Sequence, residues 1–288
     1  MLSLHTNAAA LSAQNSISRT QMALSTSQTR LSTGFRVNSA MDDAAGLQIA
    51  TRLKAQTSGM AMAMRNTQNS VSLLQTAEGS FDEVTNMLVR MKDLATQAAD
   101  ASSTAKDQTA LQSEFDALGT ELNNIMNNTT FGGQKLLTGG TISSAMTFQI
   151  GAGSTEQMTL DLTGATLMPQ LETNLGAVTA NYAAPNTIGT ELTGAGTAKT
   201  AIDNITKAID DVGNIRSSLG AAANRLDHIY NNLSNISTNT KAATGRIMDT
   251  DFASESSNMT SSQMLLQAGT AMLKQSNSTS SLVMSLLQ

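Results

Sequence analysis

The sequence has no cysteine and no tryptophan, aromatic residues make up only 3% of it, and proline occurs twice among its 288 residues. The absence of cysteine excludes disulfide frameworks, thiolate catalysis and zinc sites with cysteine ligands. The scarcity of aromatic residues argues against a compact, aromatic-rich enzyme core. Both prolines, Pro169 and Pro185, lie between two long segments that are free of the strongest helix breaker.

Recognisable catalytic and ligand-binding motifs are also missing. The two histidines, His5 and His228, form no metal-binding pair, and no nucleophile elbow, phosphate loop or dinucleotide fingerprint occurs. The net charge of −5 comes without a basic stripe, which argues against nucleic acid as a partner. No apolar run approaches the roughly 20 residues of a membrane span. We therefore expect no enzyme, no cofactor, no metal ion and no membrane insertion.

Two acidic pairs, Asp42-Asp43 and Asp249 with Asp251, precede segments with helical spacing. Acidic side chains favour the first turn of a helix because they face the positive end of its dipole. We expect this role for both pairs. Calcium binding is the alternative, but neither pair has the spacing of an EF-hand. The start of the chain lacks the basic flank and apolar core of a secretory signal peptide, which indicates another route if the protein is exported.

Both ends of the chain are unusually poor in charge. Residues 1–33 contain Arg19 and Arg30 but no acid, and residues 256–288 contain the single charge Lys274. Apolar residues recur in both at helical spacing, at Leu4, Leu11, Ile17, Leu24, Leu31, Leu265, Met272, Val283 and Leu286. Such stripes require a partner helix. Neutral polar faces are less costly to bury than ions, so partners on several sides are expected.

Strict heptads lie inside the ends. Leu74, Phe81, Leu88 and Ala95 repeat by seven, with Ala77, Val84, Met91 and Ala98 three residues later. A second pattern contains Leu111, Phe115, Leu118, Leu122 and Ile125, and a third runs from Ile205 to Ile236 over five heptads. The sequence thus predicts a mainly α fold: a long coiled-coil helical bundle, or rod, with the N- and C-termini paired in a terminal helical domain. A globular helical bundle is the alternative.

Between these helices the apolar period changes to two. Met146, Phe148 and Ile150 alternate with polar residues, and after a glycine-containing turn Met158, Leu160 and Leu162 alternate again. This pattern predicts a small β-hairpin near residues 145–162, with one apolar face on the helices. Residues 163–199 have weak periodicity, and we expect a short surface excursion with a little extended structure; a poorly structured loop is the alternative.

Several strings resemble the bacterial flagellin family. The segments that resemble its two terminal regions are residues 30–50, 75–79, 88–95, 219–226, 249–253 and 267–273, together with the closing Leu286-Leu-Gln288. The resemblance extends over residues 1–162 and 200–288. Residues 163–199 show no match and stand where many flagellins carry large variable outer domains, so this chain resembles a short form.

The resemblance implies a division into domains. Residues 1–45 and 245–288 would form a discontinuous inner helical domain with its connectors, which is the filament core. Residues 46–162 and 200–244 would form the rod with the hairpin, and residues 163–199 a short variable surface excursion. The two connectors, at 34–46 and 244–252, would link the inner domain to the rod.

The resemblance also implies a function and a set of partners. The chain would polymerise with itself into the flagellar filament for swimming motility. It would leave the cell unfolded through the flagellar type III apparatus and be found in the extracellular flagellum. The expected partners are further copies of the chain, an export chaperone on residues 250–288, and the filament cap and hook-junction proteins. Two alternatives stay open: a hook–filament junction protein, and a non-flagellar secreted coiled-coil adaptor.

A further implied partner is the vertebrate Toll-like receptor for flagellin. The family's recognition surface corresponds here to Arg90 and Leu94, which are four residues apart on one helix, with Glu114 on the next helix. The structural alternative is that these are ordinary residues of a helical bundle. A flagellin with a catalytic outer insertion would need a metal or nucleophile motif within residues 163–199, and that segment has neither.

Overall fold

The computed structural model describes the backbone of residues 7–162 and 167–286, and the side chains of this part except those of residues 279–286. Most of it is helical. The longer helices are α1 (Ala8–Thr33), α2 (Ala44–Ala98), α3 (Ala105–Asn128), α4 (Leu167–Val178), α6 (Ala195–Met248) and α7 (Phe252–Leu286), with the short α5 (Ala180–Ala183) and a 3₁₀ turn, η1 (Thr141–Ser143). The predicted mainly α fold is confirmed. Leu4 lies outside the described residues.

Four short strands form two antiparallel pairs in the described chain. Strand β1 (Thr130–Phe131) pairs with β2 (Gln134–Lys135), and β3 (Met146–Gln149) pairs with β4 (Gln157–Leu160). In the second pair, Phe148 lies opposite Met158. The side chains of Met146 and Met158 are buried, so this hairpin has an apolar face in the core. The predicted hairpin is confirmed, whereas the β1–β2 pair has no period-two signal because each strand has two residues.

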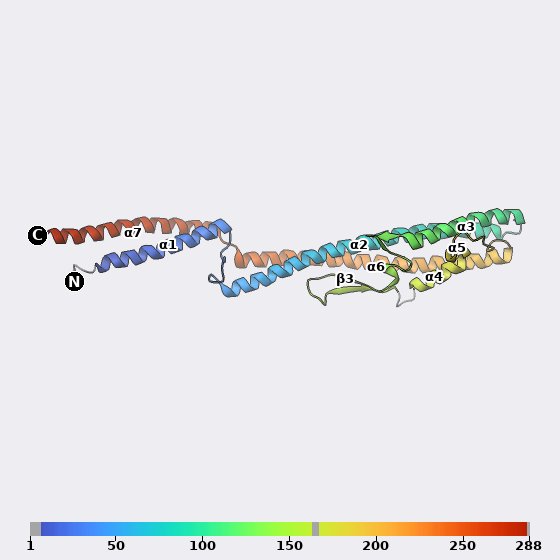
Figure 1. The fold of residues 1–288 in the computed structure, drawn as a ribbon, viewed down its shortest axis with the longest axis horizontal. Helices are drawn as coiled ribbons and strands as arrows, with labels where there is room; N and C mark the ends of the chain where they lie inside the picture. Colours follow the sequence, from blue (N-terminus) through green and yellow to red (C-terminus); the bar gives the residue numbers. More distant parts are fainter. Residues whose placement is uncertain (1–6, 163–166, 287–288) are drawn as a thin grey trace. The chain divides into compact units, whose positions relative to one another are not determined.

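The chain divides into two compact units. The terminal unit combines residues 1–57 with residues 238–288, and the central unit contains residues 58–237. Within the terminal unit α1 and α7 lie side by side, although they come from opposite ends of the sequence (Figure 1). No helix in the described part of the chain has the length and hydropathy needed to cross a membrane.

The central unit has a continuous apolar core built on the predicted heptads. Both stripes of α2 from Leu74 to Ala98 are buried, as are Phe115 and Leu122 of α3. The stripe of α6 is buried from Ile205 to Leu226, but Ile236 near its end is 39% exposed. The periodicity therefore identified the inward faces correctly over most of their length. Near Ile236 the inward face has moved to the neighbouring residue, since Ser237 is 4% exposed.

The segment after the hairpin differs from the prediction. Instead of a surface excursion with a little extended structure, or a poorly structured loop, residues 167–183 contain the helices α4 and α5. Met168, Leu171, Leu175 and Val178 are fully buried in the central core. Their spacing of three, four and three places them on one face of a helix. Pro169 is compatible with this helix because it lies in the first turn, where backbone N–H groups have no partner within the helix.

A buried polar network attaches the next residues to α3. Gln112 Nε2 donates to Asp116 Oδ1 and to Glu191 Oε2, both at 2.8 Å, and its Oε1 accepts from the backbone N–H of Leu192 at 2.6 Å. Asn181, which is fully buried, donates to Asp116 Oδ1 at 3.0 Å. Because polar groups without partners are costly to bury, these bonds hold the segment in one arrangement.

Close packing of this segment on α3 requires a glycine at position 119. A Cβ atom there would lie 2.7 Å from Thr179 Oγ1 and 3.1 Å from Asn181 Cβ. At Gly213 of α6, by contrast, a Cβ atom would meet nothing within 4 Å. A side chain at position 119 would therefore clash with residues 179–181, whereas there is space for one at position 213.

We predict that Gly119→Ala lowers the free energy of unfolding by about 1–3 kcal/mol, because the methyl group overpacks the contact with Thr179. Gly213→Ala should raise it by roughly 0.5–1 kcal/mol through helix propensity. Urea unfolding followed by circular dichroism measures both. Equal stabilisation by the two substitutions would contradict the packing of residues 179–181 on α3.

Candidate interaction surfaces

The terminal unit is built on an antiparallel contact between α1 and α7, which we call the seam. The α1 side consists of half-buried residues spaced three and four apart, namely Ala10, Ala13, Ile17, Thr20, Leu24 and Leu31. The α7 side consists of Met259, Ser262, Leu266, Gly269 and Leu273. This spacing gives each helix one narrow stripe towards the other, as in a coiled-coil pair.

Small residues let the two helices approach closely in the middle of the seam. A Cβ atom on Gly269 would lie 2.9 Å from Ile17 Cγ1, so Ile17 occupies the space that a side chain at 269 would need. At the start of α1, Asn7 caps the helix by accepting from Ala10 N at 3.0 Å. Asn7 Nδ2 also donates to the carbonyl of Ser276 at 3.2 Å. Asn7 therefore both caps the N-terminus of α1 and connects this helix to α7.

The other end of the seam contains a buried carboxylate. Glu255 is 7% exposed, accepts a 2.6 Å hydrogen bond from Ser27 Oγ, and lies 3.6 Å from Arg30 Nη1. A buried charge tolerates few positions of its partners, so this group favours a single register of the two helices. Sequence reasoning missed Glu255. Its signal was that it is the sole acid in residues 252–288.

The two connectors are joined by backbone pairing within the terminal unit. Gly34 ends α1 in the left-handed conformation, with φ of 75°, which glycine adopts without strain. The N–H of Arg36 donates to Met248 O at 2.6 Å, and the N–H of Thr250 donates to Gly34 O at 3.0 Å. Segments that are more than 200 residues apart in sequence therefore lie side by side.

Asp42, Asp43 and Asp251 accept hydrogen bonds from residues close to them in sequence. Asp43 accepts from Gly46 N at 2.8 Å at the start of α2, and Asp251 accepts from Ala253 N at 3.0 Å at the start of α7. A hydrogen bond from the Ser254 hydroxyl, followed by the Ala253 N–H, lowers the pKa of Asp251. Asp249 differs from the prediction, because it follows α6 and pairs with Phe35 in a β-bridge.

Asp42 also differs from the predicted helix-start role. Its carboxylate accepts from the N–H groups of Ser39 and Asn38, and these bonds lower the pKa of Asp42. It therefore closes the turn before α2. In the described part of the chain, no group of three or more His, Cys, Asp or Glu side chains is placed to hold a metal ion.

The predicted polymerisation residues fall into two sets. Ile17, Leu24 and Leu31 lie in the seam and are half-buried. Leu11, Leu265 and Met272 lie outside it, and each is more than half exposed. The side chains of Val283 and Leu286 are outside the described residues. The predicted stripe through Leu265 and Met272 is thus not the one that contacts α1, because the stripe through Leu266 and Gly269 takes that place.

A second apolar surface remains on the two helices after they pair. On α7, Met264, Leu265, Ala268 and Met272 are exposed on one side of the helix in neighbouring turns. On α1, Leu11 and Met22 are exposed on one face about three turns apart, with the polar residues Asn15 and Ser18 between them. We call these apolar residues the exposed strips. Large apolar side chains that stay exposed in neighbouring turns indicate a protein-contact surface.

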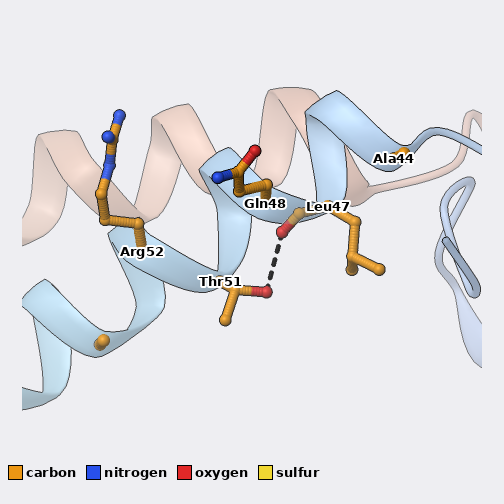
Figure 2. A pocket seen from close by; sticks show the side chains of 6 residues that line it. Ala44, Leu47, Gln48, Thr51 and Arg52 are labelled. Atoms are coloured by element: carbon orange, nitrogen blue, oxygen red, sulfur yellow. Dashed lines mark hydrogen bonds between the residues drawn. The ribbon is translucent and has the colours of Figure 1, made fainter.

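The start of α2 carries an open groove of about 480 Å³. Figure 2 shows Leu47, Gln48, Thr51 and Arg52 along it, with the hydroxyl of Thr51 bonded to the carbonyl of Leu47 at 2.8 Å. Arg52 is the one charged side chain among the lining residues. The groove therefore has no acid–base pair, and its shallow form is that of a contact surface and not of a catalytic cleft.

The predicted receptor surface in the central unit is only partly exposed. Arg90 of α2 forms an ion pair with Glu114 of α3, in which Arg90 Nε and Nη2 both donate to Glu114 Oε1, at 2.8 and 2.5 Å. Both side chains are exposed. Leu94, however, is 2% exposed and belongs to the core. Arg90 and Glu114 come together on the surface, whereas Leu94 points inward with the α2 stripe because it lies one heptad after the buried Met87.

These features define a class of protein: a helical structural protein whose two ends fold into one unit and leave apolar surface for contacts with other chains. Comparisons with known proteins agree. Residues 4–142 match the bacterial flagellin N-terminal helical region, and residues 202–287 match the C-terminal helical region. The chain therefore belongs to the bacterial flagellin family.

Similarity to individual flagellins extends over whole chains. Flagellin A of Vibrio anguillarum is 34% identical, with 100% of both chains covered, and flagellin of Halalkalibacterium halodurans is 41% identical, with 90% of each covered. The fold is also similar to a solved Vibrio parahaemolyticus structure, provisionally assigned as a flagellar hook-associated protein, with a TM-score of 0.54, 17% identity, and 72% of this chain and 100% of that chain covered. The chain is thus a structural subunit of the extracellular flagellar filament and not an enzyme.

We predict that Glu255→Ala weakens the seam by roughly 1–3 kcal/mol, because Ser27 loses its acceptor and Arg30 its counter-ion. The melting temperature of assembled filaments, followed by circular dichroism, should fall. The control is Glu83→Ala on the exposed face of α2, where a change within about 0.5 kcal/mol is expected. Equal melting temperatures for the two variants would show that Glu255 does not support the seam.

Proposed function

We propose that the terminal unit forms the core of the filament and that the exposed strips are its contacts with neighbouring copies. The carrying observation is the exposure of Leu265 and Met272 in a segment whose sole charge beyond residue 256 is Lys274. Burying this surface against another copy removes apolar area from water and desolvates few ions. Contacts made by every copy in the same way generate a polymer when the rotation between copies does not close a ring.

We also propose a functional division at the connectors. Residues 1–45 and 245–288 would act as the inner domain, residues 46–162 and 200–244 as the rod, and residues 163–199 as the short variable part. The backbone pairing of Arg36 with Met248 and of Thr250 with Gly34 supports the connectors as one structural joint.

Export and capping partners follow from the same terminal helices. We propose that the subunit leaves the cell unfolded through the flagellar type III apparatus, with an export chaperone on residues 250–288. A single pair of helices with half-exposed seams is marginal in water, so an unassembled terminal unit is easy to unfold. In the filament, the cap and hook-junction proteins would contact the same unit. Loss of chaperone binding on deletion of residues 250–288 tests the chaperone assignment.

We predict that purified subunits seeded with filament fragments elongate into long tubes visible by electron microscopy. Deletion of residues 1–33 or 256–288 should abolish elongation while the central unit stays helical by circular dichroism. Leu265→Asp should do the same, because it places a charge in the proposed contact. The matched control is Ile188→Asp, at an 88% exposed residue of the central unit.

Two results would contradict the proposal. Wild-type protein that stays monomeric or stops at small rings with seeds present would exclude a filament subunit that assembles in this way. Growth that stops at small rings would fit the alternative of a hook–filament junction protein, which the full-length similarity to flagellins does not favour. Normal elongation of the Leu265→Asp variant would exclude the strip of α7 as a contact.

A second proposal concerns host recognition. We propose that Arg90 and Glu114 form part of the surface read by the Toll-like receptor for flagellin, on the basis of the family resemblance and their shared exposure. Leu94 would support this surface from the core. The ion pair holds the Arg90 side chain in one orientation, which reduces the entropy lost on binding.

We predict that Arg90→Ala and Glu114→Ala each weaken receptor signalling by about tenfold or more, as expected for an arginine-centred contact. A reporter-cell assay with monomeric protein measures the half-maximal dose. Lys135→Ala, at an exposed site on β2, is the control and should leave it unchanged. Unchanged signalling by both α2 and α3 variants would exclude this surface.

A further inference from the structure

The described methionines differ widely in exposure, and the central unit contains both kinds, since Met62 of α2 is 51% exposed. Within the central unit, Met91, Met126 and Met168 are fully buried in the core. Within the terminal unit, the side chains of Met22, Met264 and Met272 are each more than half exposed, and that of Met41 is 97% exposed. The sulfur atoms that reagents in water can reach thus include those on the exposed strips and in the connector.

We propose that Met22, Met264 and Met272 are oxidation sites through which peroxides block assembly of the unassembled subunit. This inference rests on the proposed role of the exposed strips as contacts between copies. Met272 is next to the seam residue Leu273, and Met264 is next to Leu265 on the same side of α7. Their modification changes the surface offered to a neighbour and leaves the central core untouched.

The reaction is a two-electron oxidation by a peroxide. A lone pair of the thioether sulfur attacks one peroxide oxygen, so that an S–O bond forms and the O–O bond breaks. With hydrogen peroxide, the departing hydroxide removes the proton from the oxygen now bonded to sulfur and leaves as water. Sulfur is oxidised to the sulfoxide and the peroxide is reduced, and methionine sulfoxide reductases reverse the change.

The sulfoxide alters the contact because it replaces an apolar sulfur with a strongly polar S=O group. In the proposed contact, burial removes the water that would bond this oxygen, so the oxygen is left without a partner unless a hydroxyl or amide group of the polar residues nearby rearranges to donate to it. A buried acceptor without a partner is costly enough to shift an association equilibrium roughly tenfold or more. The consequence grows with each copy added, since every subunit of a polymer makes the same contacts.

Selectivity comes from the different surroundings of the buried and the exposed methionines. Met91 of α2 and Met126 of α3 are enclosed by the central core and react only when that core opens. Met41 in the connector is the most accessible of the named methionines, so it reports that the oxidant has acted. Partial oxidation should therefore modify the exposed methionines of the terminal unit, together with Met62 on the surface of the central unit, while the buried core of the central unit stays folded.

The test uses full-length monomer treated with hydrogen peroxide until Met41 is converted, as measured by peptide mass spectrometry. We expect sulfoxide at Met22, Met264 and Met272, little at Met91 and Met126, and an unchanged circular dichroism signal of the central unit. The critical concentration for seeded elongation should rise about tenfold or more. Treatment with methionine sulfoxide reductases should restore it.

The matched variant carries Met22→Leu, Met264→Leu and Met272→Leu. Leucine conserves volume and apolar character but cannot be oxidised, so this variant should assemble normally and resist peroxide. The single variant Met272→Gln, a permanent polar replacement, should resemble oxidised wild type.

Two outcomes would overturn the inference: oxidised wild type that elongates normally with sulfoxide at all three sites, and a triple leucine variant that loses assembly on oxidation as wild type does. Failure of untreated wild type to elongate would instead contradict the proposed contact role of the terminal unit. The untreated control thus separates the two claims.

Discussion

The antiparallel seam between α1 and α7 is the contact on which the terminal unit depends. It joins the two ends of the sequence, and its members are small or neutral over most of its length, with Gly269 receiving Ile17 in the middle. Glu255 is the exception, a buried carboxylate held by Ser27 and Arg30. Apolar contacts supply attraction without fixing a register, whereas the cap at Asn7 and the buried charge select one.

Periodicity predicted the fold well where one face of a helix dominates. The stripes from Leu74 to Ala98 and from Ile205 to Leu226 are buried as the heptads indicate, because tertiary packing rewards the same spacing that the sequence displays. The segment around Leu171 was not recognised, since alanine, glycine and threonine dilute its apolar face and Pro169 resembles a break. The residues that follow are held on α3 by Gln112 and Asn181, whose partners are distant in sequence.

The predicted interaction residues show a second limit of sequence reasoning. Helical spacing alone leaves two adjacent stripes on α7, and it does not show which stripe contacts α1 and which stays exposed, as Leu265 and Met272 do. The structure places Leu266, Gly269 and Leu273 against α1, and at Gly269 the absence of a side chain leaves room for Ile17. Leu94 was assigned to a surface with Arg90, although its place in the α2 heptad directs it to the core.

The discontinuity of the terminal unit makes completeness of the chain a condition for its formation. Helix α1 is synthesised first but finds its partner only in α7, at the far end of the sequence. A polypeptide whose translation stops before residue 252 retains Ile17 and Leu24 without the helix that covers them. Such a fragment cannot build the unit that we assign to the filament core. Pairing of the two ends therefore requires a chain that reaches α7, since a shorter fragment offers α1 no partner helix.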